Sequence, residues 1–326
     1  MKTLLPFLLL CASALVLSAE TEERIDRRFT VASRGQLVVD VGLGSIDVTA
    51  APTDEVVISV FRKVSRRTKD AEEAFLREHP TTFSQDGDTV TLHSPRDSST
   101  GGWWWFGVAR TEAHYAITVP ASCDIRLKTS GGGIAVSDLT GAVQAGTSGG
   151  ALKFVRVTGP IDGHTSGGSI EVADCAGPVR IGTSGGGIRV SGGSGTLDGA
   201  TSGGSVTVKD FRGPARVGTS GGSITIQNVS GQVRGTTSGG SITALFSTPL
   251  TDEVRLETSG GGVTVRLAEG SAFNLDAATS GGGVSTDLPV LVVGKVARDH
   301  LSGPVKGGDQ AVVLRSGGGS IRVQKL

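Results

Sequence analysis

Aromatic residues are scarce in this chain of 326 residues, which contains 10 Phe, 3 Trp and 1 Tyr. A core built mainly from small and β-branched residues suits thin stacked layers better than a thick globule. An excess of either charge is also missing, because 31 Lys and Arg residues balance 31 Asp and Glu residues. Since phosphate-backbone binding needs a concentrated basic face, we expect no nucleic-acid partner.

Apolar runs long enough to cross a membrane are absent from the sequence after its first residues. The one apolar stretch, 4–17, follows a lysine and leads to small residues that end at Ala19. This order is typical of a secretory signal peptide, so we expect residues 1–19 to be removed. A retained anchor, or a lipid on Cys11, is less favoured because the stretch is short and Leu10 precedes that cysteine. We expect a protein exported to the periplasm, the cell surface or the medium, with no transmembrane segment in the mature chain.

Glycine is abundant instead, with 51 residues, and much of it belongs to a repeated motif, Thr-Ser-Gly-Gly-x-Ile/Val. Seven copies follow one another at intervals of 18 residues, two more at intervals of 21, and a degenerate copy occupies 316–321. Chance does not produce such a register, and a short strict period predicts a solenoid. The complete copies begin at Thr129, Thr147, Thr165, Thr183, Thr201, Thr219, Thr237, Thr258 and Thr279.

Within each unit the apolar residues alternate with period two, which predicts two short strands per coil. Counted from Thr as position 1, the pairs fall at positions 6 and 8, as in Ile170 and Val172, and at 15 and 17, as in Val179 and Ile181. The same alternation turns the Thr side chains inward. Glycines in the two turns, including one at position 13 of six consecutive units, are expected to supply positive φ or close approach.

Two other solenoids with 18-residue coils do not fit. Calcium-binding repeats need Asp where these units carry their Ile-x-Val strand, and left-handed hexapeptide helices need apolar residues at positions 12 and 18. The predicted fold is all-β: a single-domain parallel β-solenoid of about 18 residues per coil, with N-terminal degenerate coils and one short helix. Because parallel crossovers are right-handed by default, we expect a right-handed coil.

Residues 20–128 are predicted to form degenerate coils, a helix and an aromatic hairpin that together cap the regular repeats of 129–326. The helix is expected over 68–79, with Thr68 as its N-cap and Pro80 ending it. A cap is expected because the open strand edges of a solenoid aggregate.

Two cysteines remain after the signal peptide, Cys123 and Cys175, and we expect both to be free thiols. They are 52 residues apart, which is nearly three coils. Three coils correspond to roughly 14 Å along the axis. A disulfide needs Cα atoms within about 7 Å. Cys175 is expected at an apolar corner of its coil.

The strongest candidate for a binding site is an aromatic cluster, Trp103, Trp104, Trp105 and Phe106, flanked by glycines. Clustered aromatics offer contact area to sugar rings, a lipid interface or another protein. The alternative, which is common in solenoids, is that these side chains fold back over the cap.

Three features make the chain resemble the bacterial "putative adhesin" family of β-solenoid domains. These are the early strands 37–41 and 44–48, the Tyr-Ala-Ile-Thr-Val-Pro strand 115–120, and the Thr-Ser-Gly-Gly-x-Ile repeats. The resemblance extends from about residue 29 to 326. It implies a binding or scaffold role at the cell envelope; some members resemble envelope-stress regulators, and the family motif carries no catalytic residues.

No residue pattern predicts catalysis. Asp138, Asp174 and Asp210 occupy position 10 of every second coil. The resulting separation of roughly 10 Å exceeds that of a glycosidase carboxylate pair. The histidines are scattered, and no nucleophile elbow or phosphate loop is present. We therefore expect no catalytic residue, no metal ligand and no cofactor.

The sequence thus predicts an exported, non-enzymatic, adhesin-like β-solenoid that acts as a binding or scaffold module at the cell envelope, with an envelope glycan or protein as its partner. Two alternatives remain open: a carbohydrate-active β-helix enzyme, and an envelope-stress regulatory protein that binds a membrane sensor. Acids gathered by the irregular segment 285–315 would favour the enzyme, but after Asp287 that segment holds only Asp299 and Asp309.

Overall fold

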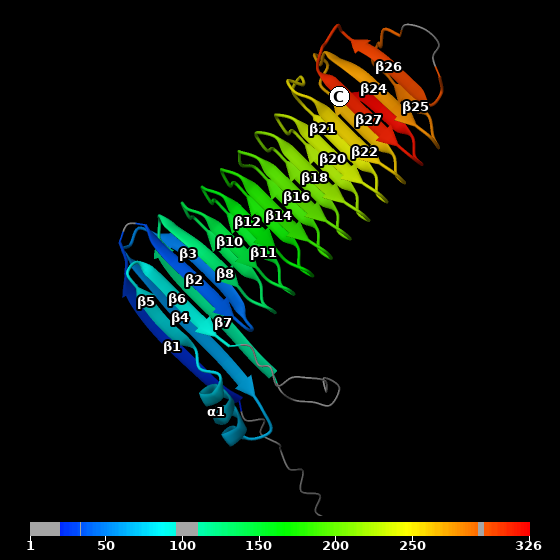
Figure 1. Ribbon diagram of the computed structural model, residues 1–326. Helices are drawn as coiled ribbons and strands as arrows, with labels where there is room; N and C mark the ends of the chain where they lie inside the picture. Colours follow the sequence, from blue (N-terminus) through cyan, green and yellow to red (C-terminus); the bar gives the residue numbers. More distant parts are fainter. Residues whose placement is uncertain (1–19, 33, 96–109, 293–296) are drawn as a thin grey trace, which may run out of the picture.

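The computed structural model describes residues 20–32, 34–95, 110–292 and 297–326. Figure 1 shows an elongated rod, with the N-terminal strands (blue and cyan) at one end and the C-terminal strands (orange and red) at the other. Two 14-stranded sheets, which we call sheet A and sheet B, run along the rod. The predicted all-β solenoid is confirmed, while its handedness stays a prediction.

Sheet A contains, in spatial order, β1 (Glu20–Thr30), β4 (Glu55–Ser65), β7 (Arg110–Pro120), β3 (Ser45–Ala51), β9 (Ile134–Ser137), β11 (Leu152–Val155), β13 (Ile170–Ala173), β15 (Ile188–Ser191), β17 (Val206–Lys209), β19 (Ile224–Gln227), β21 (Ile242–Phe246), β23 (Val263–Leu267), β28 (Ile321–Lys325) and β25 (Val284–Thr286).

Sheet B contains, in the opposite spatial order, β26 (His300–Val305), β24 (Phe273–Thr279), β27 (Ala311–Ser316), β22 (Val254–Thr258), β20 (Val233–Thr237), β18 (Ala215–Thr219), β16 (Leu197–Thr201), β14 (Val179–Thr183), β12 (Ile161–His164), β10 (Val143–Gly146), β8 (Cys123–Lys128), β2 (Gly35–Val41), β6 (Thr89–Ser94) and β5 (Thr82–Asp86).

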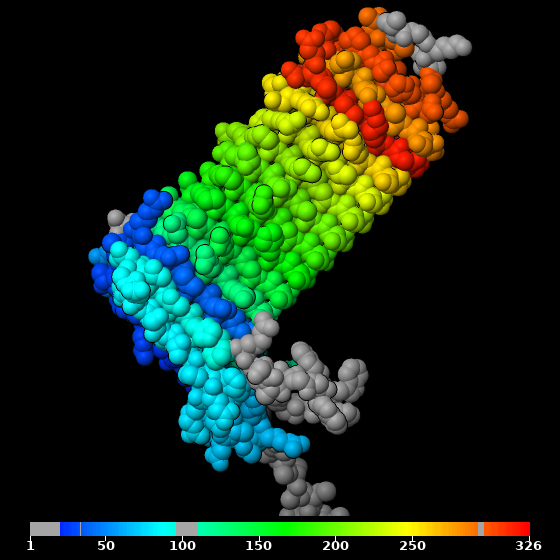
Figure 2. Space-filling view, viewed as in Figure 1, coloured from blue at the N-terminus to red at the C-terminus, as the bar shows by residue number. Residues whose placement is uncertain are grey.

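Each regular coil crosses from sheet B to sheet A through its Thr-Ser-Gly-Gly turn and returns through a corner at positions 11–13. Neighbouring coils pair in parallel and in register, so that Thr183 of β14 lies opposite Thr201 of β16. Single bridges such as Thr158 to Ala176 add a third ladder at the corner. Figure 2 shows the coils following one another from green to yellow without an intervening domain.

The core between the sheets is thin and filled by the alternating apolar side chains. Ile188 and Val190 of β15 are 2% and 1% exposed. The larger Phe154 is fully buried because Gly163, in the other sheet, leaves room for its ring: a Cβ at Gly163 would lie 3.0 Å from it. Small residues at position 17 therefore accommodate large ones at position 8.

The Thr of each motif points inward, as the alternation predicts, and its hydroxyl links two coils. Thr201 Oγ1 donates to the carbonyl oxygen of Gly186 in the preceding coil at 2.7 Å, and Gly204 N donates to Thr201 Oγ1 at 3.3 Å. The same pair of bonds recurs at Thr147, Thr165, Thr183, Thr219, Thr237 and Thr258. This ladder satisfies backbone groups that the tight turn would otherwise leave unpaired.

Glycine is required at two positions of the turns. At position 4 the coils approach so closely that a Cβ at Gly150 would lie 2.1 Å from the carbonyl oxygen of Gly132. At position 13 the backbone is left-handed, with φ of 137° at Gly159. Position 13 needs glycine for close approach as well, since a Cβ at Gly159 would lie 2.3 Å from the carbonyl oxygen of Gly141.

At the N-terminal end the chain does not stack in sequence order. The coil β2–β3 lies between the coil β8–β9 and the strands β6 and β7. Thr129 Oγ1 accordingly donates to the carbonyl of Gly44. Beyond β7, sheet A ends in the antiparallel strands β4 and β1. The free edge of the sheet is therefore β1, a strand rich in charges of both signs that disfavour pairing with another chain.

The helix α1 (Lys69–Glu78) packs against β1 through buried polar side chains. It begins after Thr68, whose hydroxyl accepts from Ala71 N, as the sequence predicts. Glu72, which is fully buried, accepts from Thr21 Oγ1 at 2.6 Å and from Arg66 N at 2.9 Å. These bonds hold the pKa of the Glu72 carboxyl below its ordinary value.

At the C-terminal end the last coil in sequence is not the last in space. The coil β27–β28 inserts between β22–β23 and β24–β25, so that β27 lies between β22 and β24 in Figure 1. The threonine ladder follows the spatial order: Ser316 Oγ donates to Gly261 O, and Thr279 Oγ1 donates to Gly319 O. Beyond β24, the antiparallel strand β26 closes sheet B.

The two cysteines are free and buried, as the coil spacing predicts. Burial raises the pKa of the Cys123 thiol to about 11 and also raises that of Cys175. Both groups are therefore neutral thiols near pH 7, with low reactivity.

Candidate binding sites on the solenoid

The aromatic cluster Trp103–Phe106 lies outside the described residues, so its binding role stays a prediction. The strands that precede and follow it are in different sheets: β6 pairs with β2 and β5, whereas β7 pairs with β3 and β4. The expectation that these two strands form a hairpin is wrong. The reason is that alternation identifies a strand but not its partner.

Position 10 of the repeat, where the sequence places Asp138, Asp174 and Asp210, has an unusual backbone conformation. Asp138, Arg156, Asp174, Asp210 and Asn228 all have left-handed backbones, with φ between 50° and 63°. Asp and Asn tolerate this conformation better than other side chains. The exception, Arg156, forms a two-bond ion pair with Asp138, at 2.6 and 2.9 Å. The acids at this position therefore shape the turn.

At position 16 of the repeat, on sheet B, like charges follow one another at one place. Arg216, Arg234 and Arg255 lie in register on three consecutive coils. Acidic neighbours offset this stack, since Asp198 lies opposite Arg216 and Glu257 Oε1 is 2.7 Å from Arg255 Nε. The stack is therefore not an uncompensated basic surface.

The end of sheet B gathers an acid, a histidine and an arginine that the sequence pattern did not single out. Asp276 of β24 pairs with Arg315 of β27, and its Oδ1 is 3.3 Å from His300 Nε2 of β26. The hydrogen bond from Arg315 lowers the pKa of the Asp276 carboxyl. An ionised carboxylate held by two partners ties three strands together and is a poor general acid.

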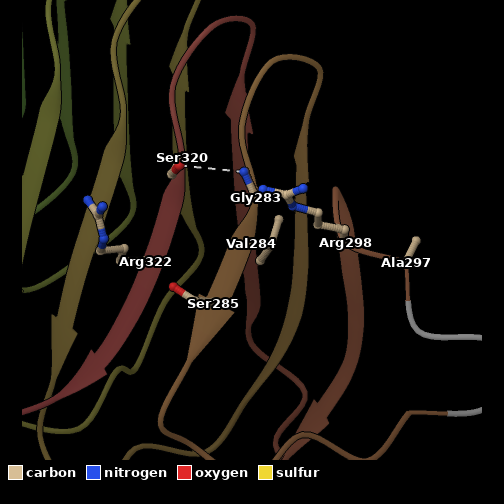
Figure 3. Close-up of a pocket in the computed structure, with 7 residues that line it drawn as sticks. All are labelled: Gly283, Val284, Ser285, Ala297, Arg298, Ser320 and Arg322. Atoms are coloured by element: carbon tan, nitrogen blue, oxygen red, sulfur yellow. Dashed lines mark hydrogen bonds between the residues drawn. The ribbon is translucent and has the colours of Figure 1, made fainter.

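Two adjoining hollows, of about 500 and 650 Å³, lie at the C-terminal end of sheet A. Residues of β25 and β28 line the first hollow, the turn residues 280–283 line the second, and the segment that begins at Ala297 contributes to both. Both hollows are lined by Gly283, Arg298 and Ser320, the first also by Arg322. Figure 3 shows the Arg298 guanidinium beside Gly283, with Arg322 on the other side of Ser320.

The titration behaviour of the described carboxyl groups bears on catalysis. Each described carboxyl with a shifted pKa is shifted downward, because a donor or cation contacts it: Glu72, Asp138, Glu269 and Asp276. A general acid needs a raised carboxyl pKa, which none of these four has.

Within the described ranges no three His, Cys, Asp or Glu side chains gather as a metal site would require. The same residues include no helix with the length and apolar character of a membrane span.

The family model described as Toastrack DUF4097 matches residues 36–324, which is nearly all of the chain between the predicted signal peptide and the C-terminus. The chain belongs to the toastrack family. Search of functionally curated proteins gives no significant match to this toastrack protein.

The solved structures that match the chain are distant in sequence. A "putative adhesin" from Bacteroides fragilis is 12% identical, with coverage of 93% of this chain and 97% of its own, at a TM-score of 0.30. A "putative lipid binding protein" from Parabacteroides distasonis is also 12% identical, with coverage of 93% and 96%, at a TM-score of 0.34. A "putative cell adhesion protein" from Clostridium sporogenes is 10% identical, with coverage of 93% and 100%, at a TM-score of 0.26. Similarities this low carry no argument about function.

Proposed function

We propose that this toastrack protein is exported and acts as a non-enzymatic, adhesin-like binding or scaffold module at the cell envelope. The observation that carries the proposal is the unbroken ladder of inter-coil hydrogen bonds, from Thr129 at one end of the rod to Thr279 at the other. A ladder in which every coil is bonded to both neighbours gives a stiff support that holds its surface side chains at fixed spacing. Stiffness of this kind serves binding, because a preorganised surface loses little entropy on contact.

Two further observations support a binding role over catalysis. The acids of position 10 are engaged in the turns, and the Asp276 cluster ties strands together. Export is supported by the signal-peptide pattern of residues 1–19. The aromatic cluster Trp103–Phe106 remains the first candidate for the contact surface, since exposed aromatics on a rigid support make effective anchors.

The test is binding of the purified mature protein, residues 20–326, to a glycan array and to envelope fractions, beside a variant with Trp103→Ala, Trp104→Ala and Trp105→Ala. We expect saturable binding by the parent protein and at least a tenfold loss in the variant, because each buried aromatic anchor contributes about 2 kcal/mol or more. Circular dichroism of both proteins checks that the solenoid is intact.

Other outcomes would replace the proposal. Shortened glycan after incubation would indicate a carbohydrate-active enzyme. Absence of binding to either material, with capture of a membrane sensor protein instead, would indicate an envelope-stress regulator. Equal binding by the parent and the variant would move the contact surface away from the tryptophans.

A further inference from the structure

The hollows at the end of sheet A lie where a chain segment is bonded alongside the last coil. Val284 N donates to Arg298 O at 2.9 Å, and Thr279 N donates to Asp299 O at 2.9 Å. These two hydrogen bonds hold the segment against the last coil. The first hollow is lined on one side by Ala297 and Arg298 of this segment and on the other by residues of β25 and β28, among them Arg322 (Figure 3).

The two arginines of the recess form no ion pair of the kind that other cations at this end form with described residues. Arg315 pairs with Asp276, and Lys325 pairs with Glu269. Arg322 instead lies in register between Thr264 and Ser285. Neither Arg298 nor Arg322 forms an ion pair with another described residue. One acid, Asp299, lines the second hollow, so the recess keeps a net positive charge.

Elsewhere in sheet A, an arginine at the strand position of Arg322 has an acidic residue beside it that offsets its charge. Arg189 of β15 occupies the equivalent outward position and lies in register with Glu171, which also pairs with Lys153 at 3.7 Å. In the regular coils a cation at this position thus has an acid on the adjoining strand. At Arg322 both adjoining residues are hydroxyl-bearing and uncharged, which leaves the guanidinium donors to an external acceptor.

We infer that the recess between Arg298 and Arg322 binds a phosphate group, carried by an envelope glycan or lipid or present as the free ion. Two guanidinium groups, one from β28 and one from the segment that begins at Ala297, complement a tetrahedral dianion, whereas one guanidinium is enough for a planar carboxylate. Both arginine side chains are exposed and long, so they can turn onto the ligand. The Ser285 hydroxyl lines the same recess and adds a neutral donor.

The test is calorimetric titration of the purified full-length mature protein with inorganic phosphate at constant ionic strength. Arg298→Ala, Arg322→Ala and the double variant are compared with Arg189→Ala as the matched control. We expect saturable binding of one phosphate, about tenfold weaker binding in each single variant, no detectable binding in the double variant, and no change in Arg189→Ala. Thermal unfolding of all variants checks the fold.

Further titrations identify the source of the phosphate. Tighter binding of glucose 1-phosphate than of the free ion indicates a glycan. Binding to phosphatidylglycerol vesicles, but not to phosphatidylcholine vesicles, indicates a lipid headgroup if the double variant abolishes it. Absence of saturable phosphate binding, or equal binding by the parent protein and the double variant, overturns the inference. Neither result affects the proposed envelope role, because that role is tested with other ligands and with the tryptophan variant.

Discussion

The threonine at position 1 adds a side-chain hydrogen bond between one coil and the next. Its side chain is buried, yet its hydroxyl donates to one coil and accepts from its own turn. A valine has the same shape but neither function. A buried carbonyl without a donor costs about 1–3 kcal/mol, so each of these hydrogen bonds should contribute measurably to the free energy of unfolding.

We expect Thr201→Val to lower the free energy of unfolding by about 1–3 kcal/mol, since it leaves Gly186 O without its donor. Thr207→Val is the matched control, because Thr207 lies outward on β17 of the same coil and its side chain makes no hydrogen bond to another described residue. The control should stay within about 0.5 kcal/mol of the parent. Urea denaturation of both variants provides the comparison; equal stabilities would show that the ladder has no energetic role.

At the scale of elements, α1 depends on tertiary contacts more than on its own sequence. A helix of 10 residues is too short to be stable alone. Its cap at Thr68 orders the first turn, but Glu72 attaches it to β1 and to the chain before it. A carboxylate whose pKa is lowered in the folded state stabilises that state above the pKa of the unfolded group, about 4.3. That stabilisation is lost as the pH falls through the lower, folded-state pKa.

We expect Glu72→Gln to speed amide hydrogen exchange in α1 at pH 7, because the uncharged amide is a weaker acceptor for Thr21 and Arg66. Acidification below about pH 4 should loosen α1 in the parent protein and have less effect in the variant. Glu73→Gln, at an exposed position of the same helix, is the control. Exchange rates are to be measured by mass spectrometry and corrected for intrinsic pH dependence. A Glu72→Gln protein with parental exchange would contradict the attachment role.

At the scale of the whole molecule, both ends of the rod are locked by a coil that is out of sequence order. The coil β2–β3 is enclosed at one end and β27–β28 at the other. Each end therefore closes through contacts between segments far apart in the chain, which are slow to form but hard to fray.

Engineered disulfides can test the C-terminal arrangement. Glu257 of β22 lies opposite Arg315 of β27, and Arg315 lies opposite Ala278 of β24. Glu257→Cys with Arg315→Cys should oxidise to a cross-link, because adjacent strands are about 4.8 Å apart. Glu257→Cys with Ala278→Cys should not, since two strand spacings exceed about 7 Å. Cross-linked peptides are to be identified by mass spectrometry. The reverse result would mean that β24 follows β22 directly.

The sequence by itself determined the coil: its length, its two inward-facing strands, the orientation of Thr201 and its equivalents, and the free thiols of Cys123 and Cys175. These follow because each coil meets the coil next to it in the chain, so the contacts repeat with the sequence period. Only the tertiary structure decided which strands β6 and β7 join, where β27–β28 insert, and that Arg298 and Arg322 line one recess. An alternating strand fits any partner whose pleat matches, and the choice among partners depends on residues far away in the chain.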